Sequence, residues 1–402
     1  MKIRNAEKEK TKELWSKDYV FLITANFFLF FAGCLLLPVL PFTLKQDGAN
    51  DFQIGVVIAV FYVTSLLMRT LTSKAAARIG KRVLLLLAMS VFTFAMVGYY
   101  LFAGLTMIII LRLVQGLGFG ASTTLYGSTV AGIVPNKRMG EGMGYFGLGI
   151  SIAFVLGPCL GAAAVSQPNF KWVFLAAALL TLVSILLTRF ISTDHAEPPV
   201  ENQTENTYRI SDFIEPKVVY ESVFVLLVGL MTGAFDTYIV LYAQQMKIAN
   251  IYLYFIITTL SEIAMRLFSG KLYDRRGMNI LVVPGAVAGL ISCLIAARAA
   301  NLPMMCVFAV FYGGSVGVIF PVLEANAMKK VAPARRIAAN ATFHNFLDVG
   351  SALGPLLFGA AAQFFGYSHS FLLSGSIFVV MLAILFFHEI FRKKGKNNLN
   401  KV

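Results

Sequence analysis

The sequence has few charged residues. Only 13% of its 402 residues are Asp, Glu, Lys or Arg, whereas 58% are hydrophobic. A soluble chain of this length would need roughly 25% charged residues to cover its surface. The mean hydropathy of +0.75 therefore excludes an ordinary soluble domain, because only lipid can accommodate so much apolar surface.

Cysteine is also scarce. The four cysteines lie far apart in apolar segments and have no C-x-x-C spacing, so they predict neither a disulfide framework nor a zinc site. The H-E-x-x-H pattern of zinc metalloproteases is missing as well. The P-loop pattern of nucleotide-binding proteins is also missing, which excludes ATP as the energy source. We therefore expect no enzyme activity, no catalytic residue, no cofactor and no metal.

Acidic residues are fewer than basic ones, and the formal net charge is +14. A nucleic-acid-binding surface would gather the basic residues along one helix or stripe. Here they form short bursts between long apolar runs, which is how orientation signals look in a membrane protein. We therefore expect a lipid bilayer, and no nucleic acid, as partner.

Long apolar runs are what the sequence has in abundance. About 20 such residues span the hydrocarbon core as a helix. Windows of this kind lie at 19–44, 53–72, 83–103, 106–133, 141–166, 171–190, 218–245, 250–270, 279–299, 303–330, 337–364 and 369–391. This pattern predicts an all-α membrane protein with twelve transmembrane helices.

The basic residues predict the orientation of these helices. They precede the first window, follow the last, and fill alternate loops, whereas the other loops hold only Lys45, Lys171, Lys247 and Arg298. By the positive-inside rule, both termini lie in the cytoplasm and the protein crosses the cytoplasmic membrane many times. The expected parts are a cytoplasmic N-terminus (1–18), a six-helix bundle (19–190), a cytoplasmic linker (191–217), a second six-helix bundle (218–391) and a basic tail (392–402).

The two predicted bundles repeat each other at a constant offset of 197 residues. The offset relates Arg69 to Arg266, Arg78 to Arg275, Gly80 to Gly277, Gly116 to Gly313, Gly120 to Gly317, Arg138 to Arg335 and Gly157-Pro158 to Gly354-Pro355. A duplicated six-span unit is the internal symmetry of an alternating-access transporter.

Several motifs resemble those of the major facilitator superfamily, over essentially the whole chain. Gly270-Lys-Leu-Tyr-Asp274-Arg275-Arg276-Gly277 is similar to the family's G-x-L-x-D-R-x-G loop, whereas Ser73 and Ala77 replace the first Gly and the Asp in the N-terminal copy. The run 111–120 around Arg112 resembles a second motif, in which a buried Arg is implicated in proton coupling. Gly147-Leu-Gly149, followed by Gly157-Pro158-Cys-Leu-Gly161, resembles the antiporter motif of the twelve-span drug:proton branch.

The resemblance implies a major facilitator fold of two pseudo-symmetric bundles, a charged loop that latches one conformation, and close helix packing at Gly and Pro. The residues implied for gating and helix packing are Gly270, Asp274, Arg275, Gly277, Arg78, Gly80, Gly157, Pro158, Gly161, Gly354 and Pro355. It also implies that spans 1, 4, 7 and 10 line a central cavity, with 2, 5, 8 and 11 beside it.

Ionisable residues within the spans are costly there, so each marks a site, a pathway or a staple between helices. Glu262 and Arg266, like His344 and Asp348, are spaced i, i+4 and can pair on one helix face. The candidates for proton coupling are Asp236, Arg112, Glu262, Asp348 and His344, with Asp236 as the first choice for the carrier.

Polar residues on the implied lining spans are the candidates for substrate contact, and Glu324 could alternatively be interfacial. These cavity candidates are Asn26, Arg69, Gln115, Thr123, Tyr126, Tyr145, Tyr238, Arg266, Tyr312, Glu324, Asn326 and Asn345.

Arginines and acids in both halves favour a polar substrate that carries both charge signs. Opine- or nicotianamine-like metallophores such as staphylopine would fit, and the chain also resembles staphylopine-type metallophore exporters. The sequence thus predicts an exporter that exchanges such a solute for protons and works as a monomer. The alternatives are a proton-coupled multidrug exporter and, in another class, a membrane sensor without transport.

Overall fold

The computed structural model of the protein describes residues 14–135, 138–191, 214–332 and 335–399. The chain divides into two compact units. Unit 1 holds residues 1–48 and 60–206, and unit 2 holds residues 49–59 and 207–402. The first turns of the helix Asp51–Ile79 therefore belong to unit 2, and the remainder of that helix belongs to unit 1. The two predicted six-helix halves remain a prediction.

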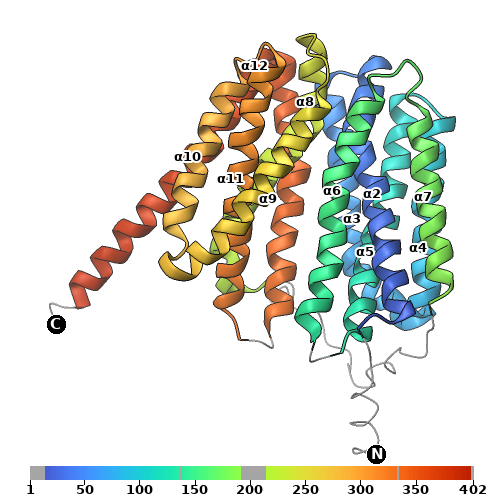
Figure 1. Cartoon of the computed structure of the whole chain (residues 1–402), viewed down its shortest axis with the longest axis horizontal. Helices are drawn as coiled ribbons and strands as arrows, with labels where there is room; N and C mark the ends of the chain where they lie inside the picture. Colours follow the sequence, from blue (N-terminus) through green and yellow to red (C-terminus); the bar gives the residue numbers. More distant parts are fainter. Residues whose placement is uncertain (1–13, 136–137, 192–213, 333–334, 400–402) are drawn as a thin grey trace, which may run out of the picture. The chain divides into compact units, whose positions relative to one another are not determined.

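Unit 1 is built from helices that run alongside one another (Figure 1). They are α2 (Lys17–Gln46), α3 (Asp51–Ile79), α4 (Lys81–Leu101), α5 (Leu105–Ile133), α6 (Met139–Ala164) and α7 (Trp172–Arg189). α2 packs against α6 and α7, and α4 packs against α5 and α7. Ser16 caps the start of α2, because its hydroxyl accepts the N–H of Tyr19.

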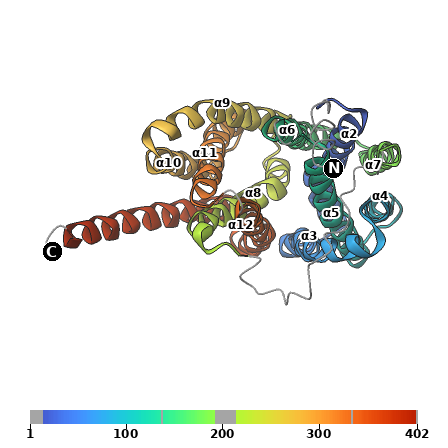
Figure 2. The same ribbon diagram turned by 90° about the horizontal axis from the view of Figure 1, so that it is seen from below.

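Unit 2 contains a short 3-10 helix and five longer helical elements. They are η3 (Pro216–Val218), α8 (Val219–Gln245), α9 (Tyr252–Arg276), α10 (Asn279–Ala296), α11 (Leu302–Lys329) and α12 (Arg336–Leu399). α8 packs along α12, and α11 packs against α9 and α10. The last part of α12 extends away from the other helices of this unit (Figures 1 and 2).

The predicted all-α membrane class is confirmed. Ten helical segments of the described chain are long and apolar enough to cross a membrane. The last of them, Ala339–Phe387, has 49 residues and would extend about 74 Å as one helix, more than twice the hydrocarbon thickness. Its backbone is non-helical at Gly366, so it supplies two spans. The count of twelve rests on this division and on α9, a 25-residue helix that carries Glu262 and Arg266.

In unit 1, glycines bring the backbones of α5 and α3 into contact. A Cβ atom on Gly116 would lie closer than 3.0 Å to the carbonyl oxygen of Phe61, and one on Gly120 equally close to that of Ser65. Only glycine permits this approach, which membrane helices use because lipid supplies no hydrophobic force to join them.

In unit 2, the same contact recurs between α11 and α9. Gly313 lies against the carbonyl oxygen of Thr258, and Gly317 against that of Glu262, again closer than 3.0 Å for an added Cβ. All four residues are displaced by 197 from their counterparts in unit 1. The repeat predicted from sequence is therefore present in the helix contacts themselves.

A second pair of contacts follows the antiporter-like motif. Gly157 and Gly161 bring α6 against α2, where Gly157 meets Cys34. Gly354, the offset partner of Gly157, brings α12 against Leu230 of α8. These three glycines thus lie where two helices come into contact.

A glycine-to-alanine substitution, which adds one methyl group, should distinguish glycines at helix contacts from glycines with open space around them. We expect Gly317→Ala to lower the apparent melting temperature of the purified protein by several degrees, because overpacking against a backbone costs about 1–3 kcal/mol. Gly127 has nothing within 4 Å of an added Cβ. Gly127→Ala is the matched control and should leave the melting temperature unchanged or slightly raised. Equal effects of the two substitutions would contradict the packing role.

Candidate functional site

Unit 1 buries a cation on α5. Arg112 is only 4% exposed, its Nη1 donates to the Gln115 side-chain oxygen at 2.9 Å, and its guanidinium lies 5.1 Å from the ring centroid of Phe61. The Tyr99 hydroxyl donates to the same Gln115 oxygen at 2.8 Å. Within the described residues Arg112 forms no ion pair, and its Nε has no hydrogen-bond partner. A buried cation without a carboxylate is costly, so this cluster can stabilise an anionic group.

Unit 2 gathers acids around α9. Glu262 and Arg266 form the predicted i, i+4 ion pair, which is therefore confirmed. Asp236 of α8 lies within electrostatic range of Glu262. Glu262 thus neighbours both a second carboxylate and a guanidinium, and this arrangement can attract a cationic group or a proton.

Aromatic rings surround this acidic cluster. Tyr254 and Tyr312 are buried and both lie within electrostatic range of Asp236. Tyr254 stacks on Phe308 at 5.2 Å, and Tyr312 lies 5.0 Å from Phe235. The Tyr312 hydroxyl is buried without a hydrogen-bond partner among the described residues, so it is available to the acidic cluster or to a ligand.

On α12, His344, Asn345 and Asp348 are all partly exposed. The Nδ1 atom of His344 lies 3.1 Å from the backbone oxygen of Asn340, and its ring lies 5.7 Å from Phe343. The proposed pairing of His344 with Asp348 remains a prediction.

Two tyrosines expected in the cavity use their hydroxyls to bind neighbouring helices. Tyr126 is fully buried, and its hydroxyl lies 3.0 Å from the Ser184 hydroxyl and 2.7 Å from that of Thr188, both on α7. The hydroxyl of Tyr238 donates to the backbone oxygens of Asp51 and Pro355. Both hydroxyls therefore hold helices together in this structure.

The remaining cavity candidates lie in mixed surroundings. Asn26 is fully buried, and neither side-chain atom has a hydrogen-bond partner among the described residues. Thr123 donates to backbone oxygens of its own helix. Arg69 on α3 and Glu324 on α11 are half-buried. Of these four residues, only Asn26 has buried side-chain polar atoms without a hydrogen-bond partner among the described residues, and these atoms could bind a ligand.

The turns of the predicted gating loops have matching backbones. Gly80 has φ +84° and Gly277 has φ +78°, conformations that favour glycine. Arg78 and Arg275 are exposed beside them. Gly270 and Asp274 belong to α9, but their surroundings lie outside the part of the chain that the structure describes, so the predicted charge latch is untested.

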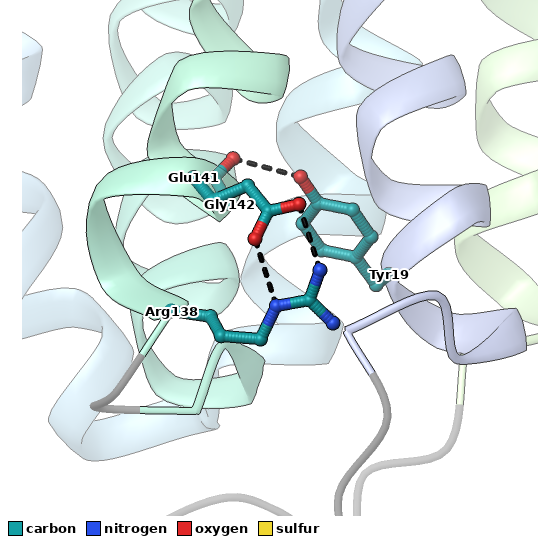
Figure 3. A network of polar contacts seen from close by, with 4 residues as sticks. All are labelled: Tyr19, Arg138, Glu141 and Gly142. Carbon is teal, nitrogen blue, oxygen red and sulfur yellow. Dashed lines mark hydrogen bonds and ion pairs between the residues drawn. The ribbon is translucent and has the colours of Figure 1, made fainter.

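Sequence reasoning missed a clamp at the start of α6. The Tyr19 hydroxyl donates to the backbone oxygen of Gly142 at 2.7 Å, while Arg138 forms two hydrogen bonds with Glu141 (Figure 3). These bonds raise the pKa of Arg138. The ring centroids of Trp15 and Tyr145 lie 4.8 Å apart near these bonds. The cavity candidate Tyr145 therefore packs against the residues just before α2.

Two buried acids in the first turns of helices were missed as well. Asp51, at the start of α3, accepts a hydrogen bond from the Tyr367 hydroxyl at 2.6 Å. Glu221, at the start of α8, is fully buried and binds Lys330 at 2.6 Å. Both lie in the first turn of a helix, where an acid interacts favourably with the helix dipole. An acid at such a position is therefore common, and the sequence gives no sign that it is buried.

The run Gly313-Gly314-Ser315-Val316-Gly317 matches the G-x-S-x-G pattern of serine hydrolases, which the sequence reasoning overlooked. The structure places it inside α11, with Ser315 buried. A nucleophile elbow needs a strand-to-helix turn that exposes the serine, so this run does not form one. No cluster of metal-binding side chains occurs within the described residues.

Known proteins match this chain over most of its length. The model of the Major Facilitator Superfamily matches residues 22–299 and 280–401. Multidrug resistance protein MdtG of Citrobacter koseri is 23% identical over 94% of both chains. The Staphylopine export protein of Staphylococcus aureus is 20% identical, over 92% of this chain and 96% of its own. Quinolone resistance protein NorA of S. aureus is 24% identical, over 85% and 89%.

Solved structures share the fold. The nucleoside transporter NupG superposes with a TM-score of 0.78 at 14% identity, over 92% of this chain and 99% of its own. A bacterial homolog of the human lysosomal transporter Spinster gives a TM-score of 0.75, over 94% and 97%. These relatives are membrane transporters and not enzymes, as the sequence predicts. The chain belongs to the Major Facilitator Superfamily.

Proposed function

We propose that this transporter exports a small polar or zwitterionic organic solute from the cytoplasm in exchange for protons. It does so from the cytoplasmic membrane, as a monomer, with both termini in the cytoplasm. Among specific substrates, an opine- or nicotianamine-like metallophore such as staphylopine fits best, because such a molecule carries carboxylates and protonated amines together.

The observation that carries this proposal is the opposite sign of the charges that the two units hold within their membrane helices. Unit 1 buries Arg112 without an ion pair among its described residues. Unit 2 carries Asp236 near Glu262, with Arg266 paired to the latter. A zwitterion carries both a carboxylate, which suits the cation of unit 1, and an ammonium group, which suits the acids of unit 2, so its two charges match the two kinds of charge that the helices hold at a cost.

Proton coupling is assigned to the acidic cluster. A carboxylate binds a proton when apolar burial disfavours its charge, and releases the proton when a cation approaches. Asp236 is the proposed carrier, because its charged neighbour is another acid, Glu262, whereas Glu262 already has Arg266 as a cationic partner. Substrate binding and proton binding would then compete for the same cluster, which is the requirement for exchange.

The second candidate is a proton-coupled multidrug exporter. Two relatives are named for multidrug and quinolone resistance. The rings of Phe235, Phe308, Tyr312 and Phe371 form a continuous aromatic cluster in unit 2, which would suit a lipophilic cation beside an acid. The buried Arg112 favours the zwitterion, since it gains nothing from a cation. A sensor without transport is the third candidate, and measurable flux in proteoliposomes would exclude it.

Neutralising the carrier should uncouple transport from the proton gradient. We expect Asp236→Asn to reduce pH-gradient-driven staphylopine uptake into inside-out vesicles at least tenfold, because the amide cannot take up a proton. Asp47→Asn, which alters an exposed acid, is the control and should transport normally. Gradient-driven transport by Asp236→Asn at the wild-type rate would show that Asp236 is not the carrier.

Removing the acceptor beside Arg112 should weaken both the fold and transport. Gln115→Leu leaves the Arg112 Nη1 and the Tyr99 hydroxyl buried without their shared oxygen, at a cost of about 1–3 kcal/mol for each unpaired group. We expect a lower melting temperature and at least tenfold slower transport. Tyr99→Phe loses only one of the two hydrogen bonds and should have the smaller effect on both measurements. A larger effect of Tyr99→Phe would show that Gln115 does not organise the cluster.

The substrate class is tested in cells with and without the gene, under metal starvation and in rich medium. Mass spectrometry of intracellular and secreted small molecules should find an opine-like chelator trapped inside the deletion strain. No change in metabolites, together with new sensitivity to lipophilic cations or quinolones, would instead support the multidrug exporter.

A further inference from the structure

The junction of α2, α5 and α7 in unit 1 encloses two polar side chains that need a further partner. Asn26 of α2 and Ser122 of α5 have no exposed surface. The amide nitrogen and oxygen of Asn26 and the hydroxyl of Ser122 make no hydrogen bond to any described residue. Buried polar atoms in native proteins nearly always have a partner, either in the protein or in an ordered water molecule.

An aromatic contact places the two side chains at the same level of the bundle. The ring centroids of Phe30 and Phe119 lie 5.3 Å apart, one on α2 and the other on α5. Asn26 precedes Phe30 by four positions, and Ser122 follows Phe119 by three. Residues at these spacings share one face of a helix. Asn26 and Ser122 therefore lie one turn from the same contact, on the faces where α2 and α5 meet.

A hydrogen-bonded contact encloses the two side chains from the other side. The Ser184 hydroxyl of α7 donates to the backbone oxygen of Ala25 at 2.7 Å and lies 3.0 Å from the Tyr126 hydroxyl of α5. Asn26 directly follows Ala25, and Ser122 lies one turn before Tyr126. On both helices, the unpartnered side chain thus lies between the aromatic contact and the hydrogen-bonded one.

The neighbouring hydroxyls have no hydrogen to spare for the amide of Asn26. A hydroxyl donates only one hydrogen bond. Ser184 donates to the backbone of Ala25, and Thr188 donates to the backbone oxygen of Ser184 at 2.8 Å. The Tyr126 hydroxyl is paired with the hydroxyls of these two residues. A donor for the Asn26 oxygen must therefore come from outside this group.

The chemistry of the site suits one neutral molecule that both donates and accepts hydrogen bonds. An amide and a hydroxyl offer donors and acceptors but no charge, and Arg112 lies ten positions before Ser122, about 15 Å along α5. Because neither side chain is exposed, a group attached to a larger solute would have to bring its whole body into the bundle, whereas water is a separate molecule. A buried water makes about three hydrogen bonds, which matches the three unpartnered atoms.

The corresponding junction of unit 2 is apolar. At the offset of 197, the four polar residues Asn26, Ser122, Tyr126 and Ser184 correspond to Val223, Ile319, Leu323 and Met381. The polar side chains are thus present together in one unit and replaced together in the other. This is the expected pattern if they form one hydrated junction, and it shows that the repeated fold also accepts an apolar one.

We propose that Asn26 and Ser122 form the binding site of one internal water molecule, which joins α2 to α5. The water accepts a hydrogen bond from the Asn26 amide nitrogen and donates to the Asn26 oxygen or to the Ser122 hydroxyl. The inference goes beyond the proposed function, because it makes Asn26 a link between two helices instead of a contact for the solute.

A double-mutant cycle tests whether the two side chains share one partner. N26L, S122A and the double variant are compared by apparent melting temperature, as full-length proteins in lipid nanodiscs. Each single substitution leaves the other side chain without the shared water and should lower the melting temperature by several degrees. The double variant leaves neither side chain unpaired and should recover at least half of that loss. S90A removes an exposed hydroxyl on α4; it is the control and should combine additively with N26L.

A density map of the wild-type protein at high resolution keeps the test decisive if N26L does not fold. It should show one isolated peak about 2.7–3.2 Å from both the Asn26 amide and the Ser122 hydroxyl. Both measurements are made without transport, so failure of the export proposal and failure of this one are distinguishable. Higher melting temperatures of the single variants, additive losses, a map without the peak, or density continuous with a larger solute would each overturn the assignment.

Discussion

Glycines let the backbones of neighbouring helices touch in both units, between α5 and α3 and between α11 and α9. Lipid does not drive helices together as water does, so their registers are fixed by close packing. The same contacts position the charged clusters. Gly116 meets the backbone of Phe61, whose ring lies beside Arg112, and Gly317 meets the backbone of Glu262. A helix that lost its glycine contact would therefore also displace the charge it helps to hold.

The sequence was sufficient for those features that are local or periodic. Apolar windows predict the helices, the offset of 197 predicts which helices correspond, and spacing alone predicts the pair of Glu262 with Arg266. Contacts between distant segments could not be predicted in this way. Asp51 and Tyr367 are 316 positions apart, and Glu221 and Asn326 are 105 apart. No pattern along the chain says which helix ends meet, or that the hydroxyl of Tyr126 faces α7 rather than a cavity.

The repeat covers the glycine contacts but not three of the charges within the membrane helices. At the offset of 197, Asp236 corresponds to Val39, Glu262 to Ser65 and Arg112 to Ala309. Gly116 and Gly120, which carry helix contacts, have glycine at their partner positions, whereas each of these intramembrane charges occurs in one copy only. Since a charge in a membrane span is retained at a cost, an unshared charge is better explained by chemistry than by a packing role common to both halves.

Some ion pairs at the helix ends occur at corresponding positions of both units, and others occur in one unit only. Arg138 and Arg335 are offset partners, and both pair with an acid, through Glu141 in unit 1 and Glu215 in unit 2. Glu221, Lys330 and Asn326 instead correspond to Thr24, Ile133 and Thr129, so unit 1 cannot form this carboxylate cluster. Ala77 likewise stands in unit 1 where unit 2 has Asp274. The helix ends of the two units are therefore held by different side chains, and a substitution of Glu221 removes a contact that has no counterpart in unit 1.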